Sequence, residues 1–272
     1  MTTLALAGSD GVELAAVEWP GASDRSVLAV HATGFCKEVW DPVAAPLSAS
    51  GVRFVAFDQR GHGSSSPPPD ADWWGLGADA ATAGATLGPF EVGSGHSSGA
   101  TAITMAAVMH PGLFRSLVVI EPVIFPPGAD YPVDLADRAR GRRDSFASLV
   151  EARDHFEGRG LFAGWVTEAL DGYLRGGLRC GADGCELACP VELEAGFYQL
   201  GMSHGVWDRL DELALPVRLL FGEGSGYHDG SAATALARRM GAELQIVPDA
   251  NHFLPMQQPQ VVATAVSEML GA

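Results

Sequence analysis

The sequence predicts an α/β fold in which a mostly parallel, doubly wound sheet carries an inserted helical cap. Three observations support this prediction. Short apolar runs without polar alternation recur along the chain, as they do in strands that are buried on both faces. Longer amphipathic segments separate these runs, and such alternation is typical of parallel sheets. The alternation stops near residue 125 and resumes near residue 216, which indicates an insertion between two strands.

The apolar runs and the segments between them define the expected elements of the sheet and its helices. The expected parallel strands are 26–31, 53–58, 90–93, 117–121, 217–221 and 244–247. The expected helices are 41–50, 78–86, 98–110, 232–240 and 257–270. Segments 4–7 and 13–19 flank a Ser-Asp-Gly turn, so we expect them to pair as a leading antiparallel hairpin.

Residues 125–205 are expected to form a cap on a core domain that comprises residues 1–124 and 206–272. An insertion of this kind is commonly a lid over a site. Its amphipathic segments are 133–142, 145–155, 161–174 and 191–202, and a small hairpin is expected within 179–190. This hairpin region carries Cys180, Cys185 and Cys189, whose spacing fits no common zinc motif. We therefore expect these cysteines to be structural thiols and expect no metal site.

The charge balance excludes several classes of partner. The 272 residues include 17 basic and 33 acidic side chains, which gives a formal charge of −16. Such a surface repels phosphate groups, so we expect no nucleic-acid partner and no polybasic membrane contact. The chain has no apolar run of about 18 residues, and its first residues do not resemble a signal peptide. We therefore expect a cytoplasmic protein with reduced cysteines.

The pentapeptide Gly95-His96-Ser97-Ser98-Gly99 has the G-x-S-x-G pattern centred on Ser97. A chance match is expected in roughly a quarter of chains with this composition, so the pattern alone could also be a simple Gly/Ser turn. The expected strand before it and the expected helix after it provide the strand–turn–helix context of a nucleophile elbow. In that geometry the serine hydroxyl projects above the sheet, where it can attack a substrate.

Three further loops follow expected strands and carry polar residues. These loops are 31–35 (HATGF), 58–65 (DQRGHGSS) and 251–255 (NHFLP). His252 lies late in the chain, at the carboxyl edge of the predicted sheet, where a general base is commonly placed. Structural roles, rather than catalytic ones, are expected for His31, Asp58, Arg60, His62 and His96.

In this order, the segments HATGF, DQRGHGSS, GHSSGA and NHFLPMQQP resemble the α/β-hydrolase superfamily over nearly the whole chain except the cap. The resemblance implies the α/β-hydrolase fold, with Ser97 as nucleophile and His252 as base. It further implies an oxyanion hole formed by the backbone N–H groups of Ser98 and Thr33. At Ala32 this chain departs from the glycine that the family often has there. No cofactor is implied.

The third member of the triad departs from the common family pattern. Many relatives carry Gly-x-x-Asp after the strand that corresponds to 217–221, but this chain has Ser225 in place of the aspartate. A serine cannot stabilise an imidazolium by charge. Some superfamily members, including haloalkane dehalogenases and zearalenone-type lactone hydrolases, place the acid at another strand end, where this chain has Glu121. Glu121 is therefore the first candidate for the acid, and Glu223 and Asp229 are the alternatives.

These observations predict a serine hydrolase that cleaves a carboxylic ester or lactone through an acyl-enzyme. The expected partner is a small, apolar acyl substrate. The cap aromatic residues suit such a substrate and suit packing on the sheet equally well; they are Phe146, Phe156, Phe162, Trp165, Tyr173, Phe197 and Tyr198. Two alternatives use the same fold. One is C–C bond hydrolysis or perhydrolysis on the same triad, and the other is a catalytically silent binding protein.

Overall fold

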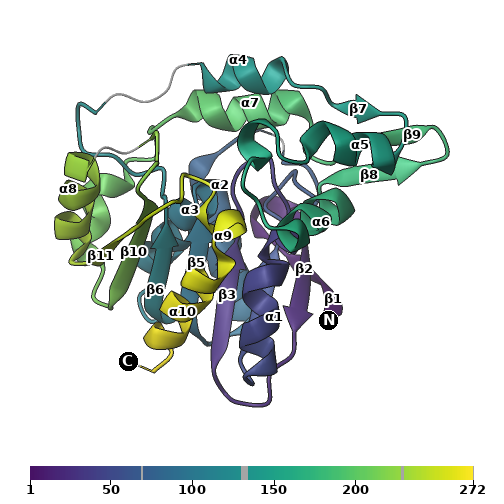
Figure 1. Cartoon of the computed structure of the whole chain (residues 1–272). Coiled ribbons are helices and arrows are strands. Elements are labelled where there is room, and N and C mark those ends of the chain that lie inside the picture. The colour runs from purple at the N-terminus through teal and green to yellow at the C-terminus, as the bar shows by residue number, and fades with distance from the viewer. Residues whose placement is uncertain (69, 130–133, 228–229, 272) are drawn as a thin grey trace.

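A computed structural model of the chain describes residues 1–68, 70–129, 134–227 and 230–271. Eight strands form one sheet in the order β1-β2-β4-β3-β5-β6-β10-β11 (Figure 1). Their bounds are β1 Thr2–Ala7, β2 Glu13–Trp19, β3 Ser26–Val30, β4 Arg53–Phe57, β5 Phe90–His96, β6 Phe114–Ile120, β10 Val217–Gly222 and β11 Glu243–Val247. The strands from β4 to β11 pair in parallel, whereas β1 and β2 are antiparallel to their neighbours. The predicted sheet and its leading hairpin are confirmed.

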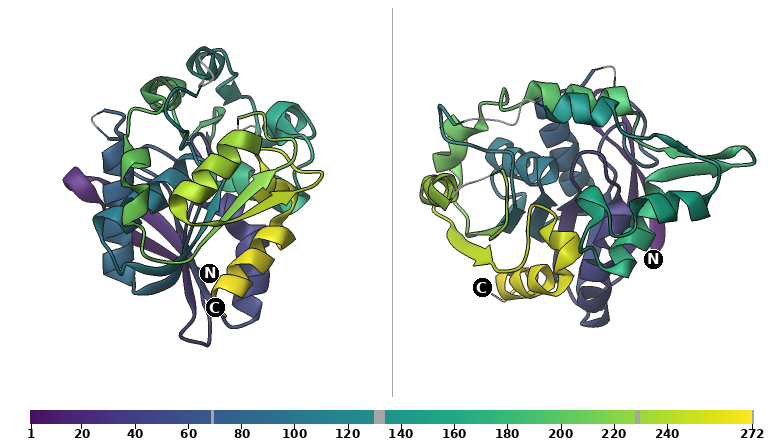
Figure 2. Two further views of the ribbon diagram at one scale, coloured as in Figure 1. Left: turned by 90° about the vertical axis from the view of Figure 1, so that its left-hand side faces the viewer. Right: turned by 45° about the horizontal axis from the view of Figure 1, so that its top comes forward.

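Helices cover both faces of this sheet, as the two views of Figure 2 show. One face carries α1 (Asp41–Ala49), α9 (Leu254–Gln257) and α10 (Pro259–Met269), and the other carries α2 (Trp73–Leu87), α3 (Ser98–Met109) and α8 (Gly230–Met240). Strand β4 shows why two cores form. Phe54 and Ala56 pack into one apolar cluster, whereas Val55 and Phe57 pack into the other. Successive side chains of a strand point to opposite faces, so a strand buried on both sides must be apolar throughout.

The segment between β6 and β10 lies over the carboxyl ends of the parallel strands (Figure 1). It contains α4 Leu135–Arg140, β7 Ser145–Phe146, α5 Leu149–Phe156, η3 Gly160–Phe162, α6 Thr167–Gly176, β8 Leu178–Gly181, β9 Gly184–Leu187, α7 Val191–Leu200 and η4 Val206–Glu212. Strands β7, β9 and β8 form a small second sheet, which includes the expected hairpin. The division of the chain into a core and a cap at residues 125 and 205 stays a prediction.

Two expected helices have different bounds in the structure. Helix α2 begins at Trp73 rather than at residue 78, because the side chain of Asp72 accepts hydrogen bonds from the N–H groups of Trp74 and Gly75. An aspartate at this position caps a helix and sets where it starts. The expected helix 257–270 corresponds to α10, which begins at Pro259, and the short helix α9 precedes it. Proline favours a helix start and disfavours a helix interior.

The cysteines differ from the expectation in one respect. Cys180 and Cys185 form a disulfide, because the antiparallel register of β8 and β9 places them directly opposite each other. The expectation of reduced thiols is therefore wrong for this pair, whereas Cys36 and Cys189 are free and buried. Disulfides are rare in the cytosol, and the cytoplasmic location stays a prediction. Within the part of the chain that the structure describes, no helix is long and apolar enough to cross a bilayer.

Candidate active site

Ser97 lies in the sharp turn between β5 and α3, with φ 55° and ψ −118°. A non-glycine residue at positive φ is strained, and such strain is common at functional turns. The turn closes only because its flanking glycines have no side chains. A Cβ on Gly99 would lie 2.3 Å from the carbonyl oxygen of Val30, and one on Gly95 would lie 2.4 Å from that of Gly99. The expected strand–turn–helix geometry is present.

His252 connects Ser97 to an acidic side chain. Its Nε2 atom lies 3.1 Å from Ser97 Oγ, and its Nδ1 atom lies 3.2 Å from Glu121 Oε2. The three side chains come from the ends of different elements. Ser97 follows β5, Glu121 directly follows β6, and His252 lies in the loop after β11. A serine, a histidine and a carboxylate in this hydrogen-bonded order have the geometry of a nucleophile, a base and an orienting acid.

Glu121 is completely buried, and both of its carboxylate oxygens have hydrogen-bond partners. Oε1 accepts a hydrogen bond of 2.8 Å from the N–H of Gly222. Oε2 accepts one of 2.6 Å from the hydroxyl of Ser225, in addition to its contact with His252. A buried carboxylate needs such partners. Ser225, which occupies the position where the family resemblance implies an aspartate, therefore supports the acid from the neighbouring strand end.

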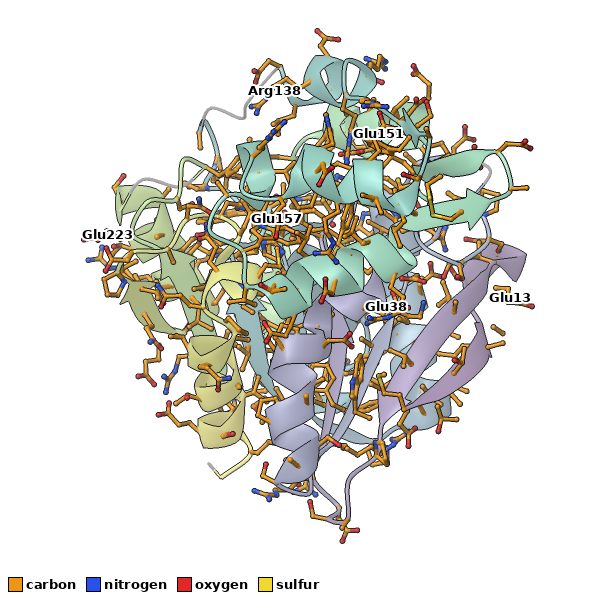
Figure 3. The ribbon with its side chains drawn as sticks, turned by 45° about the vertical axis from the view of Figure 1, so that its right-hand side comes forward. Glu13, Glu38, Arg138, Glu151, Glu157 and Glu223 are labelled. Atoms are coloured by element: carbon orange, nitrogen blue, oxygen red, sulfur yellow. A yellow bond between two sulfur atoms is a disulfide. The ribbon has the colours of Figure 1, made fainter. Side chains whose placement is uncertain are left out.

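The two alternative acids are placed differently. Glu223 is exposed at the surface (Figure 3), and its backbone N–H bonds the carbonyl of Val247. Among the described residues, the carboxylate that contacts His252 is that of Glu121. Asp229 lies outside the described residues. The geometry therefore favours the first candidate of the sequence analysis.

The two expected oxyanion donors are the backbone N–H groups of Ser98 and Thr33. Ser98 is the first residue of α3, and the first N–H groups of a helix lack intrahelical acceptors and carry partial positive charge. Thr33 follows β3 and lines the same cavity as Ser97 and His252. Their N–H groups suit a developing negative charge, and their role as donors stays a prediction.

Comparisons with known proteins identify the family of this chain. The model of the alpha/beta hydrolase family matches residues 27–265. The chain belongs to this family. It is 26% identical over 266 residues to 2-(acetamidomethylene)succinate hydrolase of Mesorhizobium japonicum, a match that covers 90% of this chain and 88% of that protein.

Solved structures of several hydrolases share the fold of this alpha/beta hydrolase. E-2-(acetamidomethylene)succinate hydrolase superposes with a TM-score of 0.85 at 22% identity, covering 100% of this chain and 99% of that one. For N-formylmaleamic acid deformylase of Pseudomonas putida the TM-score is 0.76 at 19% identity, with 97% and 100% covered. For the enol-lactonase of Burkholderia xenovorans it is 0.72 at 17% identity, with both chains fully covered. These likenesses establish the fold of the hydrolase.

Two buried histidines of this hydrolase hold the loop that contains Thr33. His31 accepts the N–H of Gln59 on Nε2 and donates from Nδ1 to the carbonyl of Ala32. His62 accepts the N–H of Gly34 on Nε2 and donates from Nδ1 to the carbonyl of Arg60. Burial lowers the pKa of each imidazole from 6.5 to about 3. Both rings are therefore neutral near pH 7, and their structural role is as expected.

Buried ion pairs anchor the neighbouring loops. Asp58 accepts the backbone N–H of Lys37 and its ammonium group, both at 2.7 Å, and the N–H of Ser64 at 2.9 Å. Arg60 donates to both carboxylate oxygens of Asp79, at 2.7 and 2.9 Å. As expected, these residues hold structure around the site, because their charges are satisfied within the protein.

A cavity of about 480 Å³ opens beside Ser97 and His252. Of the cap aromatic residues named from the sequence, Tyr198 lines it, and sequence reasoning missed four further polar residues of its lining, which are Arg138, Arg142, Glu194 and Tyr227. Most of the cap aromatic residues pack elsewhere. Phe156, Phe162 and Tyr173 pack against one another in tilted and edge-to-face arrangements, with ring centroids 4.7–5.4 Å apart. Packing therefore accounts for these three rings, and the apolar character of the substrate stays a prediction.

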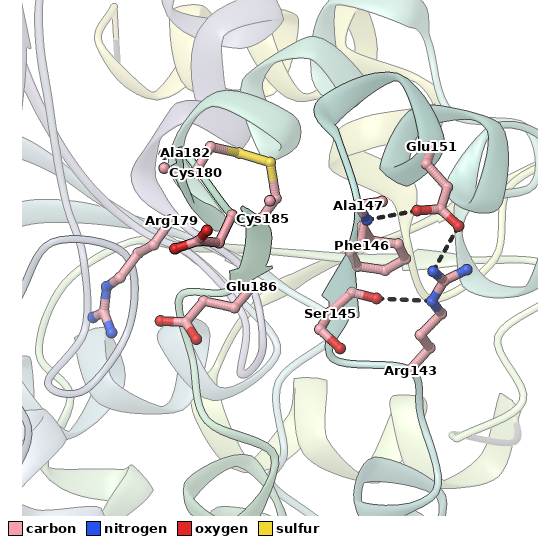
Figure 4. Close-up of a pocket in the computed structure, with 13 residues that line it drawn as sticks. Arg143, Ser145, Phe146, Ala147, Glu151, Arg179, Cys180, Ala182, Cys185 and Glu186 are labelled. Carbon is pink, nitrogen blue, oxygen red and sulfur yellow. Dashed lines mark hydrogen bonds and ion pairs between the residues drawn. A yellow bond between two sulfur atoms is a disulfide. The ribbon is translucent and has the colours of Figure 1, made fainter.

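A second hollow, of about 700 Å³, is bounded by the β8–β9 hairpin and by residues of the segment 143–151 (Figure 4). It is lined by the disulfide and by Arg143 and Glu151, which bond each other at 2.7 Å. It contains no residue of the Ser97 site. Among the described residues, no group of three or more His, Cys, Asp or Glu side chains could hold a metal ion.

Proposed function

We propose that the protein is a serine hydrolase that cleaves a carboxylic ester or lactone through an acyl-enzyme on Ser97. The observation that carries the proposal is the hydrogen-bonded chain from Ser97 through His252 to the buried Glu121. This arrangement opens into a cavity that is large enough for a small acyl compound.

In the proposed reaction, His252 Nε2 accepts the proton of Ser97 Oγ as that oxygen attacks the substrate carbonyl. Glu121 accepts a hydrogen bond from the Nδ1–H group of the resulting imidazolium and stabilises its positive charge. The N–H groups of Ser98 and Thr33 bind the oxyanion, and each lowers the activation barrier by on the order of 3 kcal/mol. His252 then protonates the leaving oxygen. A water molecule, deprotonated by His252, releases the acyl group and restores the serine.

The comparisons support an oxygen leaving group and also a second candidate. An enol-lactonase shares the fold, which favours the lactone. Two other similar proteins are named after compounds with an acylated nitrogen, which is an acetamido group in one name and an N-formyl group in the other. Hydrolysis at an acylated nitrogen is therefore the second candidate, and it uses the same triad. C–C bond hydrolysis and perhydrolysis stay alternatives, whereas the connected triad disfavours a silent binding protein.

The proposal is tested with a fluorophosphonate probe and a panel of neutral esters, lactones and N-acyl compounds. We expect the wild type to be labelled and to hydrolyse at least one ester or lactone, and Ser97→Ala to lose both properties. Ser267→Ala is the control, because that serine is exposed on α10, remote from the triad in sequence and position. Equal labelling of Ser97→Ala and the wild type would refute the nucleophile. Turnover of N-acyl compounds alone would favour the second candidate.

A further inference from the structure

One wall of the cavity beside Ser97 is formed by a row of side chains from α4 and the turn that follows it. Leu135, Arg138, Ala139 and Arg142 all line the cavity. Their spacing of three and four residues places them on one side of the helix. Arg140 is directed elsewhere, because it pairs with Glu192 at 3.0 Å. Arg138, labelled on α4 in Figure 3, therefore belongs to the side of α4 that faces the site.

The charge of Arg142 is satisfied within the protein. Its guanidinium group donates to Glu194 Oε2 at 2.8 Å and to the hydroxyl of Tyr173 at 3.0 Å. Both partners are buried. A partly buried arginine whose charge is balanced in this way has a structural role in the cavity wall, and it leaves little charge for a ligand.

Arg138 differs from Arg142 in this respect. Among the described residues, it forms an ion pair with Asp134 at 3.9 Å, which is too long for a hydrogen bond, and the two side chains are 71% and 65% exposed. Ion pairs of this kind on a helix surface are weak. The Arg138 guanidinium can therefore exchange this contact for a ligand at little cost, while its charge stays at the cavity.

Tyr227 relates Arg138 to the triad, because all of these residues line one cavity. The Tyr227 ring packs against His252 with centroids 4.3 Å apart. Burial raises the pKa of the Tyr227 hydroxyl, and the positive charge of Arg138 opposes this rise. Arg138 thus holds a cation at the cavity that Ser97 and His252 also line. In a chain with a net charge of −16, such a cation counteracts the general repulsion of anions.

We propose that Arg138 binds a carboxylate carried by the acyl part of the substrate, at the end remote from the carbonyl that Ser97 attacks. This inference rests on the proposed function and names its substrate class, a monoester or lactone of a dicarboxylic acid. A guanidinium group matches a carboxylate with two parallel N–H···O hydrogen bonds. The apolar lining of the cavity, which includes Phe125, Leu135 and Leu161, contacts the carbon chain between the two ends.

The test compares two chromogenic esters with the same acyl chain length, the mono-p-nitrophenyl ester of adipic acid and p-nitrophenyl hexanoate. The esters differ only in the terminal carboxylate. We expect Arg138→Gln to lower the ratio of their kcat/KM values, acid ester over neutral ester, by about tenfold or more. Arg138→Lys should retain part of the ratio, and the control Arg140→Gln should leave it unchanged. Added salt should lower the ratio in the wild type and much less in Arg138→Gln.

A separate binding measurement distinguishes failure of this inference from failure of the proposed function. Ser97→Ala is titrated with adipate by calorimetry, with and without Arg138→Gln, and circular dichroism verifies that each variant is folded. Binding that Arg138→Gln abolishes supports the subsite even if neither ester is hydrolysed. An unchanged ester ratio together with unchanged adipate affinity would overturn the inference, even if Ser97 is the nucleophile.

Discussion

Replacing Glu121 with glutamine is the sharpest test of the proposed catalytic acid. The structure indicates that the amide fits, because its oxygen can still accept the N–H of Gly222, as Glu121 Oε1 does at 2.8 Å. The amide NH₂ group then replaces Oε2, which faces Ser225 at 2.6 Å and His252 at 3.2 Å. The substitution therefore changes the hydrogen-bonding roles at His252 while the shape of the site is preserved.

The expected loss is about 10⁴-fold in kcat. Next to an NH₂ donor, His252 Nδ1 must act as the acceptor, so the proton of the neutral ring moves to Nε2. Nε2 is the atom that lies 3.1 Å from Ser97 Oγ, and once protonated it cannot accept the proton of the serine. Carboxylate-to-amide replacement at this triad position in a serine protease has an effect of that size. The loss corresponds to about 5.4 kcal/mol in the barrier.

The assay is steady-state hydrolysis of an ester that the wild type cleaves, with fluorophosphonate labelling as a second readout. Glu223→Gln is the matched control, because it makes the same change at an exposed carboxylate and should retain activity within about twofold. Thermal unfolding should show that both variants are folded. A Glu121→Gln enzyme with nearly full activity, or a larger loss in Glu223→Gln, would refute the assignment of the acid.

Three further predictions concern the residues around the triad. Ser225→Ala should lower kcat roughly tenfold in the same ester assay, because it removes a charge-assisted hydrogen bond of 2.6 Å. Acid should destabilise the protein between pH 6.5 and about 3, because His31 and His62 have a pKa of about 3 when folded and of 6.5 when unfolded. The contribution of the two neutral rings to the free energy of unfolding is complete above pH 6.5. Below that pH the unfolded chain takes up protons, and the free energy of unfolding falls by several kcal/mol per ring. Urea unfolding should also show Lys37→Met to be less stable by about 3–5 kcal/mol, because the substitution leaves the charge of buried Asp58 unbalanced.

Each of these predictions has an outcome that would contradict it. Activity equal to the wild type in Ser225→Ala would show that the hydroxyl does not support the acid. The urea midpoint of His62→Gln should vary less between pH 6.5 and 4 than that of the wild type. The same change of midpoint with pH in both proteins would exclude His62 as the titrating group. For the ion pair, Lys37→Met combined with Asp58→Asn should recover part of the lost stability, since no unbalanced charge is left. A double variant less stable than the single one would refute the argument.

The local structure could be predicted from the sequence to a large extent. Runs of apolar residues without alternation identified the parallel strands, because a strand covered on both faces must be apolar throughout. The elbow at Ser97 was also predictable, because the turn needs residues without a Cβ at Gly95 and Gly99 and the sequence shows glycine at both positions. These features depend on neighbours in the sequence. A helix start was mispredicted where a single cap, Asp72, determined it.

What the sequence by itself determined is the α/β class of the fold, the turn that presents Ser97 and the candidates for its partners. Only the tertiary structure decided which partners meet. Strand β6 lies between β5 and β10, so Glu121 at its end is adjacent both to the serine turn and to the loop that carries Ser225. The tertiary structure likewise brings Arg138, from the segment between β6 and β10, to the cavity beside Ser97. The physical reason is that strand order and cap packing follow from burial of the whole chain, and such long-range contacts leave no local pattern in the sequence.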